Sequence, residues 1–425
     1  MSVEAQSDSA APVIVVGGGQ AAAELAVQLR QNGHDGRIQL VCDEPHLPYQ
    51  RPPLSKSYLS GDLAVQDLRL KSPMVFDKLS IETLTGVRAL SIDRANKVLR
   101  TSANDLPYSK LALATGGTPR RVSAPGADLD NIFYLRTIAD SDAIRPNVKA
   151  GRRMVILGAG YIGLEVAAVA RKAGMDVTVI EAASRVLART MPEPMSSFYE
   201  AVHGSAGVRI VTDTMVSAFE PKAGTAEVGR VIASDGRAWN ADVVIVGIGL
   251  VANAGLASDA GLAVENGIVV DAFARTSDPD IVAAGDCTAH AEFAPDRLIR
   301  LESVSNAIEQ ARTAALTLCG KPRAYAAIPW FWSDQYDLKL QTVGLCGGHD
   351  RMVVRGAMDK RAFIAFYLRE GKLIAADAVN RPQEFAAARQ LMAKGLSPDP
   401  EVLADETRTM QDITQSALSE RMDIL

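Results

Sequence analysis

Two short stretches with the same pattern constrain the fold of this chain more than any other feature. Residues 13–28 read VIVVGGGQAAAELAVQ and residues 154–167 read MVILGAGYIGLEVA. In each, an apolar strand enters a glycine-rich turn and then an apolar helical pattern. Such a turn allows a pyrophosphate to approach the backbone closely. The helix that follows directs unpaired N–H groups and the positive end of its dipole toward the phosphates. The sequence therefore predicts two Rossmann-like dinucleotide-binding units.

The two copies match the G-x-G-x-x-G pattern to different degrees. The second has Gly158, Gly160 and Gly163 in strict register, whereas the first has Gly17 and Gly19 with Ala22 at the third small position. A single glycine-rich turn also occurs as a plain connection between a strand and a helix. The second copy is therefore what makes the dinucleotide interpretation the stronger one.

Each unit also has an acidic residue about 20 positions beyond its glycines, where a carboxylate can bind ribose hydroxyls. Asp43 and Glu44 follow the strand predicted at residues 38–41, and Glu181 follows the strand predicted at residues 177–180. Two complete units imply two dinucleotides. NAD with FAD is the simplest pair that does chemistry, because the nicotinamide delivers a hydride and the flavin passes electrons on singly.

Composition excludes several classes of protein. The chain has 425 residues, 48% hydrophobic and 22% charged, which is ordinary for a globular protein of two or three domains. A net charge of -5 (45 basic minus 50 acidic) argues against nucleic-acid binding. Residues 2–11 lack a signal-peptide pattern, and the longest uncharged run, 243–258, is too short and glycine-rich for a bilayer. We expect a frayed N-terminal tail, a cytoplasmic location and no membrane segment.

The cysteines and histidines predict no metal or redox dithiol. Cys42, Cys287, Cys319 and Cys346 never form C-x-x-C or C-x4-C, so no disulfide redox pair, iron–sulfur ligand set or four-thiolate zinc site has the spacing it needs. The five histidines are equally scattered. Cys42 stands alone at a strand end, where a buried small hydrophobic residue is a better interpretation than a redox thiol.

Three further segments suggest functional positions. Residues 48–56 (PYQRPPLSK) form a loop stiffened by three prolines that places Arg51 and Lys56 either in solvent or beside a cofactor. Residues 111–119 (LALATGGTP) indicate a domain boundary near Thr115. Residues 281–286 (IVAAGD) end in Asp286 at the carboxyl end of a strand, where open α/β sheets bind ligands, although Asp286 would also suit the cap of a following helix.

The last hundred residues have a different character. Asn266-Gly267 lies between LAV and IVV, ahead of this region, and predicts a hairpin there. Residues 329–336 (PWFWSDQY) then contain two tryptophans, and residues 338–366 alternate apolar and polar residues in short runs broken by glycines. This alternation is typical of an antiparallel sheet. Trp330 and Trp332 are more often core residues, yet either would also serve as the wall of a cofactor pocket.

Glu165 and Lys56 suggest an ion pair. Glu165 lies two residues past Gly163 on the predicted nucleotide helix, and Lys56 lies on the proline-rich loop of the first unit. We hypothesise that they pair near the flavin and adjust its potential. The other interpretation is that Glu165 is an ordinary carboxylate on a helix surface.

Seven strings in this order carry a resemblance: VVGGGQAAAE, RPPLSK, LALATGG, VILGAGYIGLEVA, TSDPDIVAAGD, ESVSNAIEQAR and PWFWSDQYDLKLQTVG. The chain resembles the FAD-dependent NADH:ferredoxin reductases of bacterial oxygenase systems. The resemblance implies a glutathione-reductase-like α/β fold. Such a fold contains two Rossmann-like dinucleotide-binding domains and, in addition, a C-terminal α+β domain with an antiparallel sheet. The expected domains are FAD-binding at 1–114 and 249–326, NAD-binding at 115–248, and C-terminal at 327–425.

The resemblance also implies site residues. Those for FAD are Gly17, Gly19, Ala21, Asp43, Arg51, Lys56, Ala89, Arg136, Asp286, Val304 and Trp332. Those for NAD are Gly158, Gly160, Ile162, Gly163, Glu181, Arg189 and Gly249. Lys56, Glu165 and Trp332 are the expected catalytic residues. Many members of the family have a third glycine where this chain has Ala22, a small difference that we expect to leave FAD binding intact.

The implied electron acceptor is a separate, acidic [2Fe–2S] ferredoxin that supplies a cytochrome P450 or, second, a Rieske dioxygenase. Basic residues that would receive it are Arg312, Arg351, Arg355, Lys360 and Arg361. Glu181 favours NADH because it repels a 2′-phosphate, although Arg185 and Arg189 lie nearby in the sequence. Two oligomeric states, monomer and weak homodimer, remain open. Two other functions also remain open. One is an NADH oxidase, peroxidase or coenzyme A disulfide reductase that uses Cys42, and the other is an NADH-sensing flavoprotein.

Overall fold

The computed structural model describes residues 11–291 and 297–424, so the expected N-terminal tail lies outside the described residues except at its last position. The chain divides into two compact units. Unit 1 comprises Met1–Arg51, Val65–Thr118 and Leu250–Ala327, and unit 2 comprises Pro52–Ala64, Pro119–Gly249 and Ile328–Leu425. The functional domain boundaries expected from the sequence remain a prediction.

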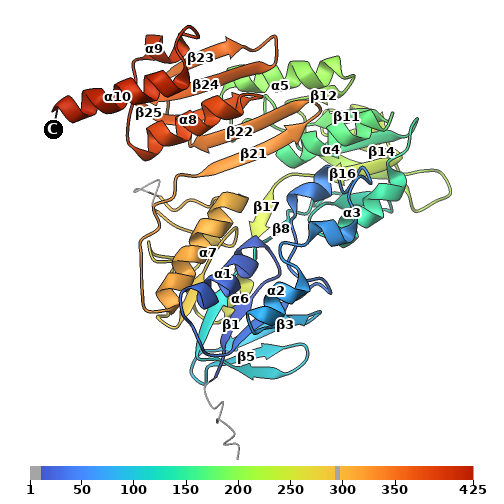
Figure 1. The fold of residues 1–425 in the computed structure, drawn as a ribbon. Coiled ribbons are helices and arrows are strands. Elements are labelled where there is room, and N and C mark those ends of the chain that lie inside the picture. The colour runs from blue at the N-terminus through green and yellow to red at the C-terminus, as the bar shows by residue number, and fades with distance from the viewer. Residues whose placement is uncertain (1–10, 292–296, 425) are drawn as a thin grey trace, which may run out of the picture. The chain divides into compact units, whose positions relative to one another are not determined.

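A five-stranded parallel sheet forms the centre of unit 1 (Figure 1). Its strands run in the order β19 (Ile281–Ala283), β7 (Lys110–Leu113), β1 (Val13–Val16), β2 (Ile38–Cys42) and β3 (Ile81–Thr85). Parallel strands covered on both faces read as continuous apolar runs, and every residue of β1 and β2 is buried.

The two faces of this sheet are covered differently. Val13 and Val15 of β1 pack with α1 (Gln20–Gln31) and α7 (Val304–Leu318), which lie side by side. Ile14 and Val16 face the other way. They pack with α6 (Gly255–Asp259) and with a small antiparallel sheet of β4 (Ala89–Asp93), β5 (Val98–Thr101) and β6 (Asp105–Pro107).

The remaining elements of unit 1 are short. They are η2 (Val65–Leu68), α2 (Pro73–Lys78), β17 (Leu250–Ala252), β18 (Ile268–Val269) and β20 (Thr288–Ala289). β8 (Gly117–Pro119) pairs with β17 where the chain passes between the units. Asn266 and Gly267 turn tightly with positive φ, as predicted, but the hairpin is reduced to one antiparallel bridge, because β18 pairs in parallel with β20.

Unit 2 contains a second five-stranded parallel sheet. Its order is β12 (Arg209–Val211), β11 (Asp176–Ile180), β10 (Arg153–Leu157), β16 (Val243–Val246) and β9 (Ile132–Tyr134). The helices of this part are α3 (Ile138–Ile144), α4 (Tyr161–Lys172) and α5 (Glu193–Ser205), with short turns η1 (Pro52–Ser55) and η3 (Arg145–Asn147). A three-stranded sheet of β13 (Val216–Pro221), β14 (Val228–Ala233) and β15 (Ala238–Asn240) packs against Val155 and Leu157 of β10.

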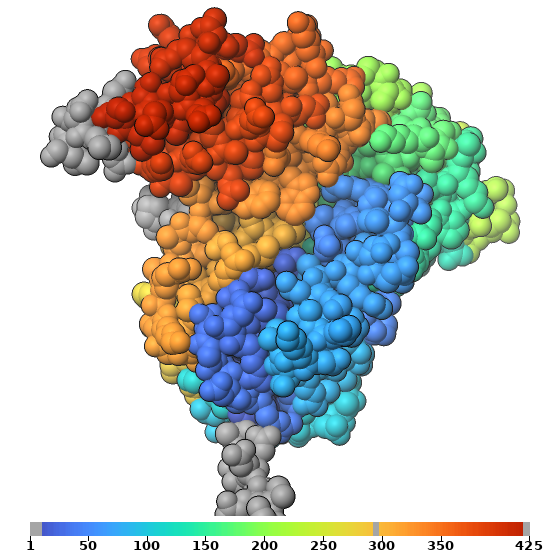
Figure 2. Space-filling model, in the orientation of Figure 1, coloured from blue at the N-terminus to red at the C-terminus, as the bar shows by residue number. Residues whose placement is uncertain are grey.

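A five-stranded antiparallel sheet completes unit 2. Its order is β21 (Trp330–Gln335), β22 (Leu338–Gly344), β25 (Lys372–Val379), β24 (Ala362–Arg369) and β23 (Arg351–Ala357). Helices α8 (Pro382–Ala393), α9 (Pro400–Ala404) and α10 (Met410–Ile424) share its apolar core. Figure 2 shows this part as one continuous orange-to-red surface. The predicted fold class, two parallel nucleotide-type sheets and a C-terminal antiparallel sheet, is confirmed.

No helix within 11–291 or 297–424 is long and apolar enough to cross a bilayer.

Candidate functional site

The first glycine turn is tight on one side and open on the other. Gly17 has φ +140°, and a Cβ there would lie 2.2 Å from the carbonyl oxygen of Ala114, so no larger residue fits. Gly19 is the N-cap of α1, where no side chain caps the helix and nothing lies within 4 Å of an added Cβ. Ala21 follows on the buried side of α1. An uncapped helix N-terminus facing open space is what a pyrophosphate requires.

The second glycine turn, in unit 2, repeats this arrangement with a separate reason for each glycine. Gly158 has φ +98°, and its Cβ would lie 2.4 Å from the Gly247 carbonyl oxygen. Gly160 is the uncapped and open N-cap of α4. A Cβ on Gly163 would lie 2.1 Å from the Gly158 carbonyl oxygen, because α4 packs directly against the turn. Ile162 leaves 46% of its surface exposed at the start of α4.

The predicted ribose-binding acids have different surroundings. Asp43 forms a bidentate ion pair with Arg88, with N···O distances of 3.0 and 2.8 Å, and both side chains are exposed. Glu181 accepts hydrogen bonds from the backbone N–H groups of Ala159, at 2.6 Å, and Ala183, at 2.8 Å. Its carboxylate is therefore held at the glycine turn itself. Sequence reasoning missed Arg88, since no local pattern marks it.

Arg51 is held by two residues of its own unit. It donates to Glu44 at 2.8 Å and to the hydroxyl of Tyr49 at 3.0 Å, and its guanidinium lies 5.0 Å from the centre of the Tyr49 ring. Tyr49 in turn donates to Glu44 at 2.5 Å. Glu44 therefore orients the proline-rich loop, whereas Asp43, its neighbour, remains the candidate for the ribose.

The hypothesised ion pair between Lys56 and Glu165 is present in unit 2. Lys56 Nζ lies 2.8 Å from Glu165 Oε2, and Ser55 Oγ donates to the same oxygen at 2.5 Å. Ser333 Oγ donates to the other oxygen, Oε1, at 2.6 Å. Glu165 is only 3% exposed, so it is not a helix-surface carboxylate. Three donors offset the cost of burying its charge. That the pair lies near a flavin stays a prediction.

Trp332 precedes Ser333 on β21 and stacks on Trp330, with ring centres 5.5 Å apart. Successive side chains of a strand point to opposite faces. Because Ser333 points to Glu165, Trp332 lies on the other face of β21. It is half-buried, which leaves part of the indole accessible to a ligand.

Two predicted NAD residues lie close together. Gly249 has φ +109°, and an added Cβ would lie 4.0 Å from the guanidinium of Arg189. Arg185 is used differently: it donates to the carbonyl oxygens of Met191 and Ala188 and to Ser196. Arg185 is thus committed to holding the backbone after β11, which removes one of the two residues that suggested NADPH.

The other predicted cofactor residues lie on separate elements. Ala89 begins β4, Val304 begins α7 and Arg136 precedes α3. Asp286 follows β19, but it is not the N-cap of the next described helix: β20 comes next, and the N-cap of α7 is Ser303, which accepts from the N–H of Asn306. The capping interpretation of Asp286 is therefore wrong. The cofactor roles of these four residues stay predictions.

Cys42 has the environment of a structural residue. It is fully buried on β2, and its thiol donates to the Gly17 carbonyl oxygen at 3.4 Å. Burial, and then the nearby Glu44 charge, raise the pKa of Cys42 to about 12. The thiolate that redox chemistry needs is therefore scarce at neutral pH. In the described part of the chain, no group of three or more His, Cys, Asp and Glu side chains is arranged for a metal ion.

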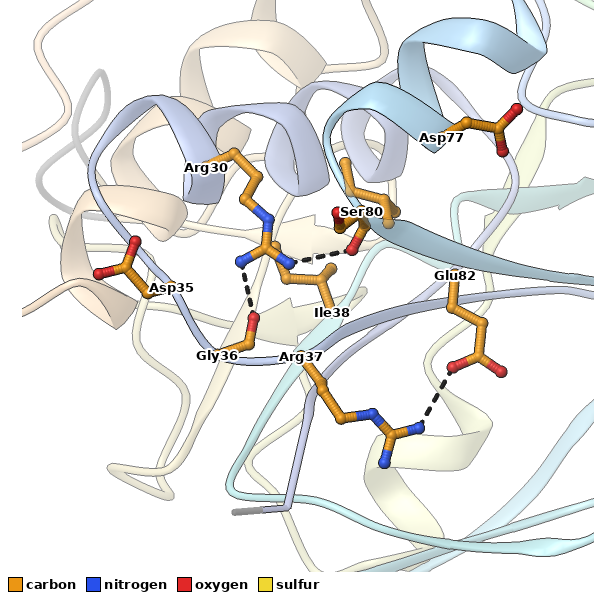
Figure 3. A pocket seen from close by; sticks show the side chains of 9 residues that line it. Arg30, Asp35, Gly36, Arg37, Ile38, Asp77, Ser80 and Glu82 are labelled. Carbon is orange, nitrogen blue, oxygen red and sulfur yellow. Dashed lines mark hydrogen bonds and ion pairs between the residues drawn. The ribbon is translucent and has the colours of Figure 1, made fainter. Parts of the chain in front are cut away.

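A surface pocket of about 530 Å³ lies in unit 1, away from these residues (Figure 3). Arg30, Arg37 and Glu82 are among its lining residues, near the starts of β2 and β3. Parallel strands begin at the edge of the sheet opposite the glycine turn. Arg30 donates to the carbonyl oxygens of Gly36, at 2.6 Å, and Ser80, at 2.9 Å, so its charge supports the loops around the pocket.

The basic residues expected to receive ferredoxin are not equivalent. Arg355 is 5% exposed and donates to the carbonyl oxygens of Asp405 and Arg408. It is wrong as a docking residue because its charge is used inside the C-terminal domain. Arg312 is paired with Glu24, at 2.8 Å, and Glu309, at 2.7 Å. Arg361 is paired with Asp337 at 2.9 Å. Arg351 and Lys360 are exposed and stay candidates.

Comparisons with known proteins cover nearly the whole chain. Residues 11–314 match the pyridine nucleotide-disulphide oxidoreductase family, and residues 330–414 match the reductase C-terminal family. Putidaredoxin reductase CamA of Pseudomonas putida is 44% identical over 412 residues, 96% of this chain and 98% of that protein. Rhodocoxin reductase of Rhodococcus erythropolis is 43% identical over 92% of each chain. A crystal structure of a covalent putidaredoxin reductase–putidaredoxin complex superposes with a TM-score of 0.92, covering 96% of this chain and 99% of that one.

Proposed function

Because this chain belongs to the pyridine nucleotide-disulphide oxidoreductase family, we propose that it carries electrons from NADH, by way of FAD, to a separate [2Fe–2S] ferredoxin. The family and its ferredoxin–NAD reductases use FAD and NAD(H), so the chain is a flavoprotein oxidoreductase. One observation supports the proposal above the others: Glu165, which forms the buried ion pair with Lys56, lies on α4, the helix whose N-terminus forms the second glycine turn. Charge is thus available beside a dinucleotide site.

Each turnover must balance two electrons. NADH and two oxidised ferredoxins give NAD⁺, two reduced ferredoxins and one proton. FAD supplies the conversion of one hydride into two single electrons. The protein residues supply binding and electrostatics: the two glycine turns hold pyrophosphates, and Glu181 selects the ribose without a 2′-phosphate.

Lys56 and Glu165 have opposite electrostatic effects on any reduction that adds negative charge nearby. The Lys56 ammonium favours the added charge, whereas Glu165 opposes it and holds the ammonium in place. A buried pair of this kind adjusts a potential without a net charge of its own. No proton transfer from the protein to a substrate is needed.

The acceptor is the finer part of the proposal. The similar solved structure is a complex with putidaredoxin, which supports a separate protein as the acceptor for this chain too. We favour a ferredoxin that supplies a cytochrome P450 over one that supplies a Rieske dioxygenase. We place the protein in the cytoplasm, where NADH is regenerated, and as a monomer or weak homodimer.

The experiment is an anaerobic visible spectrum of the purified protein, recorded before and after NADH and then after a [2Fe–2S] ferredoxin with cytochrome c as the reporter. We expect rapid bleaching of a flavin band by NADH, with cytochrome c reduced only when ferredoxin is present. Bleaching without ferredoxin-dependent turnover would leave an oxidase or a sensor. A protein that purifies from flavin-supplied cells without a flavin band would contradict the proposal altogether.

A Cys42→Ser variant separates the proposal from a thiol-dependent oxidase or coenzyme A disulfide reductase. The buried, high-pKa thiol predicts that this variant keeps full NADH-dependent ferredoxin reduction. Loss of turnover with FAD still bound would instead favour redox chemistry at Cys42.

A further inference from the structure

A line of buried hydrogen bonds extends from Glu165 through unit 2. Ser333 Oγ donates to Glu165 at 2.6 Å, and Gln335 Nε2 donates to Ser333 Oγ at 3.1 Å. The Gln335 Oε1 atom lies 2.8 Å from His203 Nε2, and His203 Nδ1 lies 3.3 Å from the Tyr336 hydroxyl. Glu165, Ser333, Gln335 and His203 are each at most 3% exposed. The line joins α4, β21 and α5, which are far apart in the sequence.

Every hydrogen bond in this line has its direction set by the carboxylate. An ionised Glu165 only accepts, so Ser333 gives it the hydroxyl proton and must itself accept from the Gln335 amide. The Gln335 carbonyl then faces His203 and requires a proton on Nε2. Neutral His203 accepts through Nδ1, where the Tyr336 hydroxyl donates. Burial lowers the pKa of His203, which agrees with a neutral ring.

The same geometry excludes proton conduction along the line. Gln335 is a primary amide, which donates through nitrogen and accepts through oxygen but does not exchange the two roles as a hydroxyl or imidazole does. The residues can therefore orient Glu165 but cannot carry a proton from it. Aligned donors also polarise one another, which strengthens the bond that reaches the carboxylate.

We propose that Ser333, Gln335 and His203 are positioning residues that keep the Glu165 carboxylate turned toward Lys56, and that through this pair they set the midpoint potential of the bound flavin. The inference rests on the proposed function, because it takes Lys56 and Glu165 to act on FAD. Without the Ser333 hydroxyl, the Glu165 carboxylate loses the hydrogen bond that fixes its Oε1 atom, so the carboxylate can turn away from Lys56. The Lys56 charge is then less fully offset, and the flavin becomes easier to reduce.

The test measures the flavin midpoint potential of holoenzyme carrying Ser333→Ala. We expect reduction to become more favourable by about tenfold in the equilibrium constant, about 30 mV upward for a two-electron couple. Ser333→Thr keeps the hydroxyl and should restore the potential. Ser196→Ala is the matched control, because Ser196 is also 1% exposed and hydrogen-bonded in unit 2 but donates to the Val186 carbonyl oxygen.

Two further measurements keep the inference testable if Ser333→Ala fails to fold. His203→Gln should shift the potential in the same direction by a smaller factor. In the wild-type protein, nitrogen NMR of labelled histidine should show His203 as a neutral ring protonated at Nε2. An unchanged potential in Ser333→Ala, or a His203 ring protonated at Nδ1, would overturn the inference. A wild-type protein that holds FAD but never reduces ferredoxin would contradict the proposed function instead.

Discussion

At the scale of the residue, two buried carboxylates in unit 2 have opposite environments. Glu165 is surrounded by an ammonium and two hydroxyl donors. Asp377, on β25, accepts a hydrogen bond from Tyr367 at 2.6 Å but has no ion pair with any of the described residues. Burial raises the pKa of Asp377 to about 7, and the Tyr367 hydrogen bond lowers it only in part. With a pKa of about 7, Asp377 changes its protonation state within the physiological pH range.

Asp377 should make stability depend on pH. Between its ordinary pKa near 3.8 and the folded value near 7, the folded protein holds a proton that the unfolded chain releases. Folding stability therefore falls as pH rises through this window, by at most about 1.4 kcal/mol per pH unit, and levels off above 7. Asp377→Asn removes this slope. Thermal unfolding measured from pH 5 to 8 should show that the melting temperature of the variant increases relative to that of the wild type up to about pH 7.

The matched control for this prediction is Asp359→Asn, since Asp359 is exposed. Its unfolding curve should stay parallel to that of the wild type across the pH range. Parallel curves for Asp377→Asn as well would mean that Asp377 is ionised in the folded protein.

Glu181 should decide between NADH and NADPH. Its carboxylate is fixed by two backbone N–H groups, so its charge cannot turn away from a 2′-phosphate. We expect Glu181→Gln to lower the ratio of kcat/KM for NADH over NADPH by about tenfold or more, which corresponds to about 1.4 kcal/mol. Glu193→Gln, at the exposed start of α5, is the control and should leave the ratio unchanged. An unaltered ratio in Glu181→Gln would assign selectivity to another residue, with Arg189 as the first to examine.

At the scale of the element, α4 makes a close contact with its glycine turn, and we predict that this contact sets how closely a dinucleotide can approach. α4 carries Gly163 one turn from its N-terminus, so the helix backbone can pack against the Gly158 carbonyl. The same helix carries Glu165 two residues later. One close contact therefore positions both the N-terminus of α4, where we predict that a phosphate binds, and the buried carboxylate of the same helix.

Gly163→Ala should separate NAD binding from FAD binding. Its Cβ would lie 2.1 Å from a backbone oxygen, so α4 must move away from the turn. We expect the KM for NADH to rise at least about tenfold and the melting temperature to fall, with FAD retained because the Gly17 turn belongs to unit 1. Steady-state kinetics and the flavin content of the purified protein measure both effects.

Gly204→Ala is the control for this substitution. Gly204 lies inside α5, where an added Cβ meets nothing within 4 Å. Alanine there should be neutral or stabilising by up to about 1 kcal/mol, because it reduces the entropy of the unfolded chain. If both variants bound NADH equally well, the clash at Gly163 would be relieved without cost to the site.

At the scale of the whole molecule, the chain carries a net charge of -5, and the proposed ferredoxin is acidic as well. Long-range repulsion between the two proteins means that docking depends on local basic residues. Arg312 is a poor residue for a charge-reversal test, since a glutamate there would join Glu24 and Glu309. Lys360, in the exposed turn between β23 and β24, is a cleaner choice.

Lys360→Glu should raise the KM for ferredoxin severalfold and leave NADH-to-ferricyanide turnover unchanged, because only the protein acceptor needs a docking surface. Lys222→Glu makes the same change of charge in the exposed turn between β13 and β14. It should have little effect on either assay. Equal effects of the two substitutions would indicate a response to net charge rather than a docking site.

Local sequence patterns were enough to predict the two nucleotide units, the antiparallel C-terminal sheet and the family. Glycine spacing, apolar runs and alternation are local patterns, and local backbone sterics and burial turn them into strands, turns and helix starts. The two glycine turns could be located for the same reason. Asn266-Gly267 marks the limit of local reasoning: the turn formed as predicted, but the pairing of β18 depended on the distant strand β20.

Which charges are buried, and which groups form hydrogen bonds with them, became clear from the folded chain. Ser333 lies 168 positions from the Glu165 carboxylate to which it donates, and nothing near either residue marks the other. Arg355 is a charged residue of a type that usually lies on the surface, yet its guanidinium donates hydrogen bonds to the backbone carbonyl oxygens of Asp405 and Arg408. Desolvation and hydrogen bonding act between residues brought together by folding, so their outcome is set by contacts in space and not by the order of the chain.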